Sequence, residues 1–176
     1  EGNVGNKFYE DFIHGSASHE VLFRNFLRGE QAGRVDANIA IGFEERNTRM
    51  NVIGNVLGVM GHPVVYEQRA PGPFDTWMPT IFWLGDPDDT EVAGTLLRRA
   101  NYDFFHNCVW DDMAGACMDA ASIDAAALPA SLYLSGPPSW WNGAPFPPFG
   151  PDRAEPSVPR ISRIPAEDRF HSLTGT

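Results

Sequence analysis

A short recurring pattern constrains the fold more than any other feature of the chain: two or three apolar residues, a spacer, an asparagine and further apolar residues. Copies of this pattern occupy residues 21–27, 52–57 and 104–109. Their asparagines are Asn25, Asn55 and Asn107, and the opening residues look like the end of an earlier copy that contains Asn3. The asparagines are 22, 30 and 52 residues apart. These spacings predict one or two coils of a parallel β-helix, with insertions in the loops.

In such a solenoid each coil lays short strands on the coil below, and apolar side chains point into the interior. An asparagine at the turn hydrogen bonds to backbone groups, and stacked copies form a ladder. We therefore predict that Asn25, Asn55 and Asn107 stack on one another. We also predict that six apolar side chains are mostly buried: Val21, Phe23, Val52, Ile53, Phe104 and Val109.

The composition agrees with short strands joined by many turns, because the chain has 17 glycines and 15 prolines and only 20% of its residues are charged. A net charge of -10 argues against a nucleic-acid partner, since phosphate binding requires a basic surface. No apolar run approaches the roughly 18 residues that a membrane helix needs. We therefore expect no membrane span.

Two regions of different composition divide the chain. Residues 1–135 are expected to form the coils with inserted loops, and residues 136–176 an extended segment, rich in tryptophan and proline, whose tail packs on the solenoid. Four local features are expected as well: a loop at 60–79 too rich in proline and glycine for a continuous strand, a short helix within 86–99, a helical turn within 120–129 and a strand at 131–134.

Three segments near the end of the chain resemble the closing part of secreted bacterial right-handed parallel β-helix repeat proteins of the pectate-lyase-like superfamily. They are Leu-Pro-Ala-Ser-Leu-Tyr-Leu-Ser at 128–135, Pro-Ser-Trp-Trp at 138–141 and Pro-Pro-Phe-Gly-Pro-Asp at 147–152. Residues 11–19 and the earlier coils look like the same group. The resemblance implies an all-β, right-handed parallel β-helix with loop excursions and an aromatic, proline-rich C-terminal segment. It also implies a secreted or cell-surface protein, and chains that are usually longer, so that catalytic residues could lie in upstream coils missing from this sequence.

Polysaccharide lyases of this fold class use a basic residue to remove a proton, and they bind the substrate acid through Ca²⁺ held by carboxylates. The resemblance therefore makes His14, His19, Arg24 and Arg28 the candidate catalytic residues. The alternative is that the two histidines are turn residues that hydrogen bond to neighbouring coils.

Three further groups are candidates for a role in binding or stability. Asp86, Asp88 and Asp89 could hold Ca²⁺, which takes oxygen ligands, or could form a solvated loop that caps a helix. The pair Trp140 and Trp141 could be a platform on which sugars stack, or could cover apolar surface of the solenoid. The two cysteines, Cys108 and Cys117, could form a disulfide in an oxidising compartment or remain buried thiols.

Two functions of different classes fit these observations. The first is an extracellular module that binds or processes polysaccharide and, if it is an enzyme, is a polysaccharide lyase or glycoside hydrolase of the β-helix type. The alternative is a structural solenoid for surface display, adhesion or filament and multichain assembly without catalysis. The repeated pattern has already begun at Glu1. We therefore expect the N-terminal end of the solenoid to be covered by another chain, by a missing N-terminal part of the precursor or by a second copy stacked head to tail.

Overall fold

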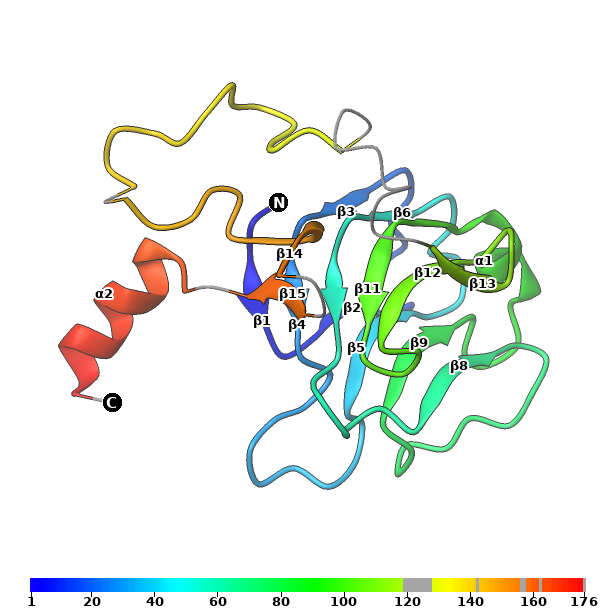
Figure 1. Cartoon of the computed structure of the whole chain (residues 1–176). Helices are drawn as coiled ribbons and strands as arrows, with labels where there is room; N and C mark the ends of the chain where they lie inside the picture. The colour runs from blue at the N-terminus through cyan, green and yellow to red at the C-terminus, as the bar shows by residue number, and fades with distance from the viewer. Residues whose placement is uncertain (119–127, 142, 156–157, 162, 176) are drawn as a thin grey trace.

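The computed structural model describes residues 1–118, 128–141, 143–155, 158–161 and 163–175, and these ranges are built mainly of β-strands (Figure 1). Most of the strands are short, because turns interrupt the apolar runs after a few residues. Two α-helices occur in the described residues: α1 (Thr90–Thr95) and α2 (Pro165–Thr174). Neither of them is long and apolar enough to cross a membrane.

Three sheets carry most of the strands, and the chain passes through them in rotation. Sheet 1 contains β1 (Val4–Gly5), β4 (Phe26–Leu27), β7 (Val56–Leu57), β11 (Asn101–Asp103), β12 (Cys108–Asp111) and β13 (Ala116–Met118). Sheet 2 contains β2 (Phe8–Glu10), β5 (Ile39–Phe43), β9 (Thr80–Leu84) and β8 (Val65–Arg69). Sheet 3 contains β3 (Val21–Phe23), β6 (Asn51–Ile53) and β10 (Leu97–Arg99). The chain visits sheets 1, 2 and 3 in that order three times before β11 returns to sheet 1.

Successive passes of the chain pair in parallel and in register. In sheet 1, Val4 pairs with Phe26 and Phe26 pairs with Val56. Antiparallel pairs extend sheet 1 from β11 through β12 to β13 and form a separate hairpin of β14 (Phe149–Glu155) and β15 (Val158–Ile161). The fold is therefore mainly β, with parallel sheets and antiparallel additions.

A ladder of four asparagines runs along the turns that lead into sheet 1. The backbone N–H and the side-chain Nδ2 of Asn3 both donate to Oδ1 of Asn25, each at 3.0 Å. Asn25 donates in the same way to Asn55 at 2.9 Å, and Asn55 donates to Asn101 at 3.0 Å. Asn55 is fully buried, so the ladder satisfies polar groups that water cannot reach.

The last member of the ladder is Asn101, and the prediction that placed Asn107 there is wrong. The residue before each ladder asparagine has a positive φ: 70° at Gly2, 50° at Arg24, 65° at Gly54 and 52° at Ala100. Asn107 instead has a positive φ of 57° itself and lies in the turn between β11 and β12, where its Oδ1 accepts a 2.6 Å hydrogen bond from the Tyr102 hydroxyl. The ladder position therefore requires a left-handed residue before the asparagine.

The core lies between the three sheets. Phe23, Val52 and Val109 are buried as predicted, whereas Ile53 and Phe104 are only partly buried and pack against the core. The prediction for Val21 is wrong, because its side chain is 48% exposed. It lies on β3, the edge strand of sheet 3, where no described strand covers it.

The two ends of the stacked strands differ. At the β11 end, the hairpin β12–β13 continues sheet 1, and a disulfide joins Cys108 to Cys117 with a Cα–Cα distance of 5.8 Å. Sheet 2 ends at β8, which pairs with the outer edge of β9. This strand lies inside the segment 60–79, where we expected no continuous strand. It can form there because residues 64–70 contain neither proline nor glycine.

The short helix expected within 86–99 is confirmed as α1, which Asp89 caps by accepting the Glu91 N–H at 2.9 Å. The strand expected at 131–134 is not formed, because Ser131 Oγ accepts the N–H groups of Tyr133 and Leu134 in a tight turn. Most of the helical turn expected within 120–129 lies outside the described residues.

The C-terminal region is more structured than the extended tail that we expected. The β14–β15 hairpin is followed by α2, which begins at Pro165 and ends at Gly175 in a left-handed cap with φ 70°. Proline in the first turn, acidic residues beside it and glycine at the end are the usual boundaries of a helix. In Figure 1, α2 and the loop that precedes β14 extend from the same side of the sheets.

We predict that Asn55→Ala lowers the free energy of unfolding by about 3 kcal/mol, because it leaves buried donors of Asn25 without an acceptor. Chemical denaturation measures this change. Asn6→Ala is the control, because this exposed residue lies outside the ladder, and its effect should stay below about 0.5 kcal/mol. Equal effects of the two substitutions would contradict a stabilising ladder.

Candidate functional site

The buried side chain of Arg24 connects the coils to the C-terminal region. Its Nε donates to the carbonyl of Pro129 at 2.7 Å, and Nη2 donates to the carbonyl of Leu128 at 3.0 Å. Nη1 donates to the carbonyl of Phe149 at 3.3 Å. Nη1 and Nη2 each reach one carboxylate oxygen of Asp152 at 2.8 Å. All five donors of the guanidinium are therefore occupied, and we call this set of contacts the Arg24 clamp.

The Arg24 clamp holds both ends of one loop, because its partners lie on either side of residues 130–148. Gly150 lets the guanidinium come close to the backbone: its φ is 155°, and a Cβ at this position would collide with Arg24 Nη1. Phe149 beside it is fully buried and packs against Phe26 in the core. The loop that carries Trp140 and Trp141 is thus fixed to the sheets at its two ends.

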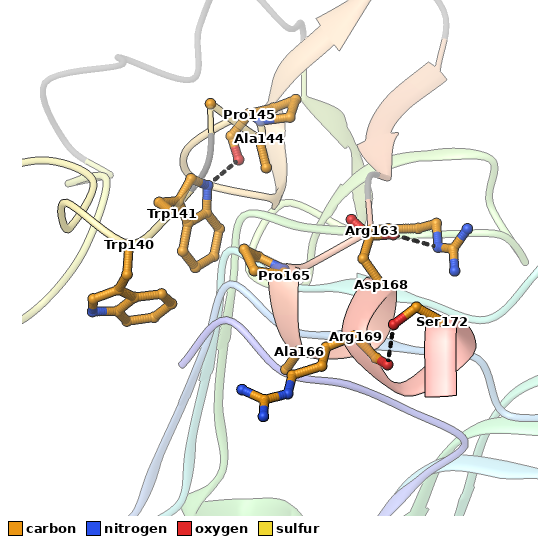
Figure 2. A pocket seen from close by; sticks show the side chains of 11 residues that line it. Trp140, Trp141, Ala144, Pro145, Arg163, Pro165, Ala166, Asp168, Arg169 and Ser172 are labelled. Atoms are coloured by element: carbon orange, nitrogen blue, oxygen red, sulfur yellow. Dashed lines mark hydrogen bonds and ion pairs between the residues drawn. The ribbon is translucent and has the colours of Figure 1, made fainter. Parts of the chain in front are cut away.

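The loop and helix α2 enclose a groove of about 1120 Å³ (Figure 2). Trp140 and Trp141 line it from the loop side, together with Gly143, Ala144 and Pro145. The other side is formed by α2 and the residues that lead into it: Arg163, Pro165, Ala166, Asp168, Arg169 and Ser172. Residues far apart in the sequence thus form one surface, which we call the Trp groove.

The two indoles differ in how freely they can meet a ligand. Trp140 is 63% exposed, and its ring lies 5.7 Å from that of Trp141 at an angle of 54°. Trp141 is held in place by the ring of Phe146 and by a 3.3 Å hydrogen bond from its Nε1 to the carbonyl of Pro145. One ring therefore presents a free face, and its neighbour is a fixed support.

Polar groups face the indoles across the groove. Arg163 Nε lies 3.0 Å from Asp168 Oδ1, and both side chains are about half exposed. Arg169 reaches out from α2 on the side of Trp140 in Figure 2, and among the described residues its guanidinium has no hydrogen-bond or ion-pair partner. An aromatic face opposite both charge signs suits a ligand with apolar C–H faces and many hydroxyl groups.

The four candidate catalytic residues do not form a site. Arg24 is buried in the clamp, and Arg28 contacts Glu167 of α2 at 3.5 Å. His14 and His19 are exposed side chains whose Nδ1 atoms contact Asp11 and Ser18. Within the described residues, none of the four forms a hydrogen bond with another. Arg24 is therefore not free to contact a substrate, because its donors are already used, and the catalytic role of the other three residues stays a prediction.

A small cavity of about 220 Å³ does lie beside His14, lined also by Tyr9, Glu10 and Asp11. Burial, with the charges of Glu20 and Asp11, raises the pKa of Glu10. Hydrogen bonds from His14 and Ile13 lower the pKa of Asp11. The cavity thus holds two unlike carboxyl groups together with His14, whereas the other three candidate catalytic residues do not line it.

The acidic cluster is not brought together as a metal site. Asp89 caps α1 through Oδ1 and accepts the Arg46 N–H through Oδ2 at 2.8 Å. Asp86 Oδ2 accepts the indole N–H of Trp83 at 3.3 Å, and Asp88 is exposed. Within the ranges that the structure describes, no group of three or more histidine, cysteine, aspartate or glutamate residues is placed to hold a metal ion. The segment is therefore a loop in which Asp89 caps helix α1, which was the alternative to a Ca²⁺ site.

A polar cluster that the sequence analysis missed joins β8, β10 and the β12–β13 hairpin. Arg98 Nη1 pairs with Glu67, and Arg98 Nε lies 3.1 Å from Asp112. The Tyr66 hydroxyl donates to Asp112 at 3.0 Å. Burial raises the pKa of Asp112, although the charge of Arg98 opposes this shift. This cluster could not be identified from the sequence, because Tyr66 and Asp112 are 46 residues apart.

Next to this cluster, Asp103 fixes the ring of His106. It accepts the backbone N–H of His106 at 2.7 Å and lies 3.0 Å from its Nδ1. The imidazole stacks on Trp110 at 3.6 Å with an interplanar angle of 2°. The sequence carries a signal here, since Asp-Phe-x-His at 103–106 repeats the order at 11–14. In both copies the aspartate accepts the backbone N–H of the histidine and contacts its Nδ1, so the motif fixes the histidine ring in each place.

Comparisons of the chain with protein-family models, with curated proteins and with solved structures find no match.

We predict that Arg24→Met lowers the free energy of unfolding by about 3–5 kcal/mol, because the Asp152 carboxylate then stays buried without its cation. Adding Asp152→Asn should recover part of the loss. Arg34→Met is the matched control, since the Arg34–Asp36 pair is exposed and worth less than about 1 kcal/mol. Urea unfolding followed by tryptophan fluorescence measures all three variants, and a clamp variant as stable as the control would contradict the assignment.

We also predict that stability falls as the pH rises above about 10, because two tyrosines keep their protons in the folded state. Burial raises the pKa of Tyr9 and of Tyr66 well above the ordinary value of 10.0. Above that pH the unfolded chain loses these protons and the folded chain retains them, so unfolding becomes easier. Urea unfolding from pH 8 to 11 should show a shallower decline for Tyr9→Phe than for the parent chain. Equal slopes would contradict the prediction.

Proposed function

We propose that the three parallel sheets form a right-handed parallel β-helix of the pectate-lyase-like kind. The rotation of the chain through sheets 1, 2 and 3 supports this reading, since each rotation would be one coil. The ladder from Asn3 to Asn101 supports it as well, because one asparagine occurs in each rotation. The spacing of 22 residues between Asn3 and Asn25 is the length of a coil with minimal loops.

We propose further that the chain is an extracellular module that binds polysaccharide in the Trp groove. The observation that carries this proposal is the exposed face of Trp140 beside the fixed ring of Trp141, opposite the charged groups of α2. A sugar ring stacks its C–H face on an indole, while its hydroxyls form hydrogen bonds with charged and polar side chains. The groove offers Asp168 as an acceptor and Arg169 as a donor for these bonds.

Binding is proposed here rather than processing of the polysaccharide. The candidate catalytic histidines lie on residues 14–19, and neither of them lines the Trp groove. Asp168, the acidic residue of the groove wall, is paired with Arg163. The disulfide between Cys108 and Cys117 supports an extracellular location, because such bonds persist in oxidising compartments.

We predict that Trp140→Ala raises the dissociation constant for the bound polysaccharide by about tenfold or more, since stacking on one indole contributes over 1.4 kcal/mol. Affinity electrophoresis against a panel of neutral and acidic soluble polysaccharides identifies the ligand, and calorimetry with its oligosaccharides gives the constants. The melting temperature should stay unchanged, because the ring is mostly exposed.

Trp77→Ala is the matched control for this experiment. Trp77 is 66% exposed, similar to Trp140, but it does not line the Trp groove. Its removal should leave polysaccharide binding intact. The proposal fails if the parent chain migrates freely in every polysaccharide, or if both tryptophan variants lose the same affinity.

A further inference from the structure

A second cavity adjoins the Trp groove, and we call it the side pocket. Its volume is about 260 Å³. The two hollows have four lining residues in common: Trp140, Trp141, Pro165 and Ala166. Leu134 and Phe146 line the side pocket but not the groove. Because the two hollows share a wall that contains both indoles, one ligand has access to both of them.

The lining of the side pocket is mostly apolar. The ring of Phe146 packs edge-on against Trp141, with the ring centres 5.5 Å apart, so this wall is aromatic and fixed. The indole N–H of Trp141 already donates to a backbone carbonyl of the same loop. Three lining residues are prolines, which have no N–H donor: Pro147, Pro148 and Pro165. These walls suit a part of a ligand that forms few hydrogen bonds.

The charged side chains that line the side pocket already have partners. Among its described lining residues these are Glu1 and Arg24. The Glu1 carboxylate accepts from Ser131 Oγ and from the Leu132 N–H. All donors of Arg24 are used in the Arg24 clamp. Neither group is free to pair with a charge on a ligand, so we expect an uncharged group in this pocket.

The volume of the side pocket narrows the choice of that group. An apolar cavity of about 150 Å³ binds benzene. The side pocket, at about 260 Å³, therefore has room for an aromatic ring and for the few atoms that link it to a sugar. An acetyl group would leave most of this volume empty and forfeit contacts with the walls. An aromatic acyl ester has the size, the lack of charge and the flat ring that Trp141 and Phe146 favour.

The inner side of the side pocket rests on rigid parts of the molecule. The Arg24 clamp lies there, and the Arg24 side chain is buried. Ile164 lines the pocket and packs against the core cluster that contains the fully buried Phe149. A pocket that is formed before the ligand arrives loses little free energy to ordering when it is filled.

We propose that the side pocket binds a hydroxycinnamoyl ester carried by the polysaccharide in the Trp groove. The sugar ring stacks on the exposed face of Trp140, and the aromatic ring of its ester enters the pocket beside Trp141 and Phe146. This inference rests on the proposed binding of polysaccharide, and it names the class of ligand: a polysaccharide that bears aromatic acyl groups.

Methyl 4-hydroxycinnamate is the probe for the side pocket alone, because it carries the ring and the ester without a sugar. Calorimetry with the parent chain should show saturable binding at one site, and methyl acetate, an ester without a ring, should show none. Leu134→Trp should weaken binding of the probe by about tenfold or more, because the added indole occupies the space of the aromatic ring. Leu134 is 45% exposed, so the core is not disturbed.

Tyr133→Trp is the matched control, because it adds an indole at the next position, where an exposed side chain lines neither hollow. It should bind the probe as the parent chain does. Leu134→Asp leaves the volume open but makes the apolar wall charged, and it should also weaken binding. A parent chain that does not bind the probe, or equal affinities of the Leu134 variants and the control, overturns the proposal.

Affinity electrophoresis separates this inference from the proposed function. The two matched gels contain a hydroxycinnamoylated arabinoxylan and the same preparation after mild alkaline removal of its esters. The dissociation constant of the parent chain should be about tenfold lower for the esterified form, and Leu134→Trp should lose this difference. Equal migration of the parent chain in the two gels overturns the inference. Retention by other polysaccharides of the panel then keeps the proposed function, and free migration in all of them rejects it.

Discussion

The asparagine ladder is the interaction on which the rest of the structure depends. Each step requires a turn in which the residue before the asparagine has a positive φ. In this turn the backbone N–H and the Nδ2 of the asparagine both reach Oδ1 of the next asparagine. Glycine provides this conformation at positions 2 and 54 without steric cost. Arg24 and Ala100 adopt it at a cost of about 1–2 kcal/mol each, which the hydrogen bonds of the buried ladder offset. The register of sheet 1 follows, because each of these strands begins at its asparagine or directly after it.

The Arg24 clamp shows how one turn of the ladder gains a second role. The left-handed turn at position 24 places a long side chain beside the ladder, where the other turns have glycine or alanine. Its guanidinium then reaches Asp152 and three carbonyls of the C-terminal region. A buried ion pair alone contributes little net stability, because both charges lose their hydration. Here every donor is satisfied, so the clamp fixes the loop of Trp140 and Trp141 to the coils at small cost.

The sequence predicted the parts of the structure that depend on local pattern. Asn25 and Asn55 stack as expected, and the acidic start of the segment at 86–99 correctly indicated α1. The neighbours of Asn107 match the apolar pattern, but membership of the ladder depends on backbone conformation, which the pattern does not reveal. Signals for α2 were present in Pro165, Glu167 and Gly175, but the proline-rich residues before them favoured an extended tail. The Trp pair could be identified from the sequence. The opposite wall of the Trp groove could not, because it forms only when α2 packs near a loop that is distant in the sequence.

The first two residues connect the coils to the loop of the Trp groove. The carboxylate of Glu1 accepts hydrogen bonds from Ser131 Oγ and from the Leu132 N–H, on the loop that carries Trp140 and Trp141. Gly2, the next residue, donates to the carbonyls of Phe23 and Arg24 at the start of the clamp. Glu1 and Gly2 therefore help to hold the loop of the groove beside the clamp, and the coils, the clamp and the Trp groove form one connected structure.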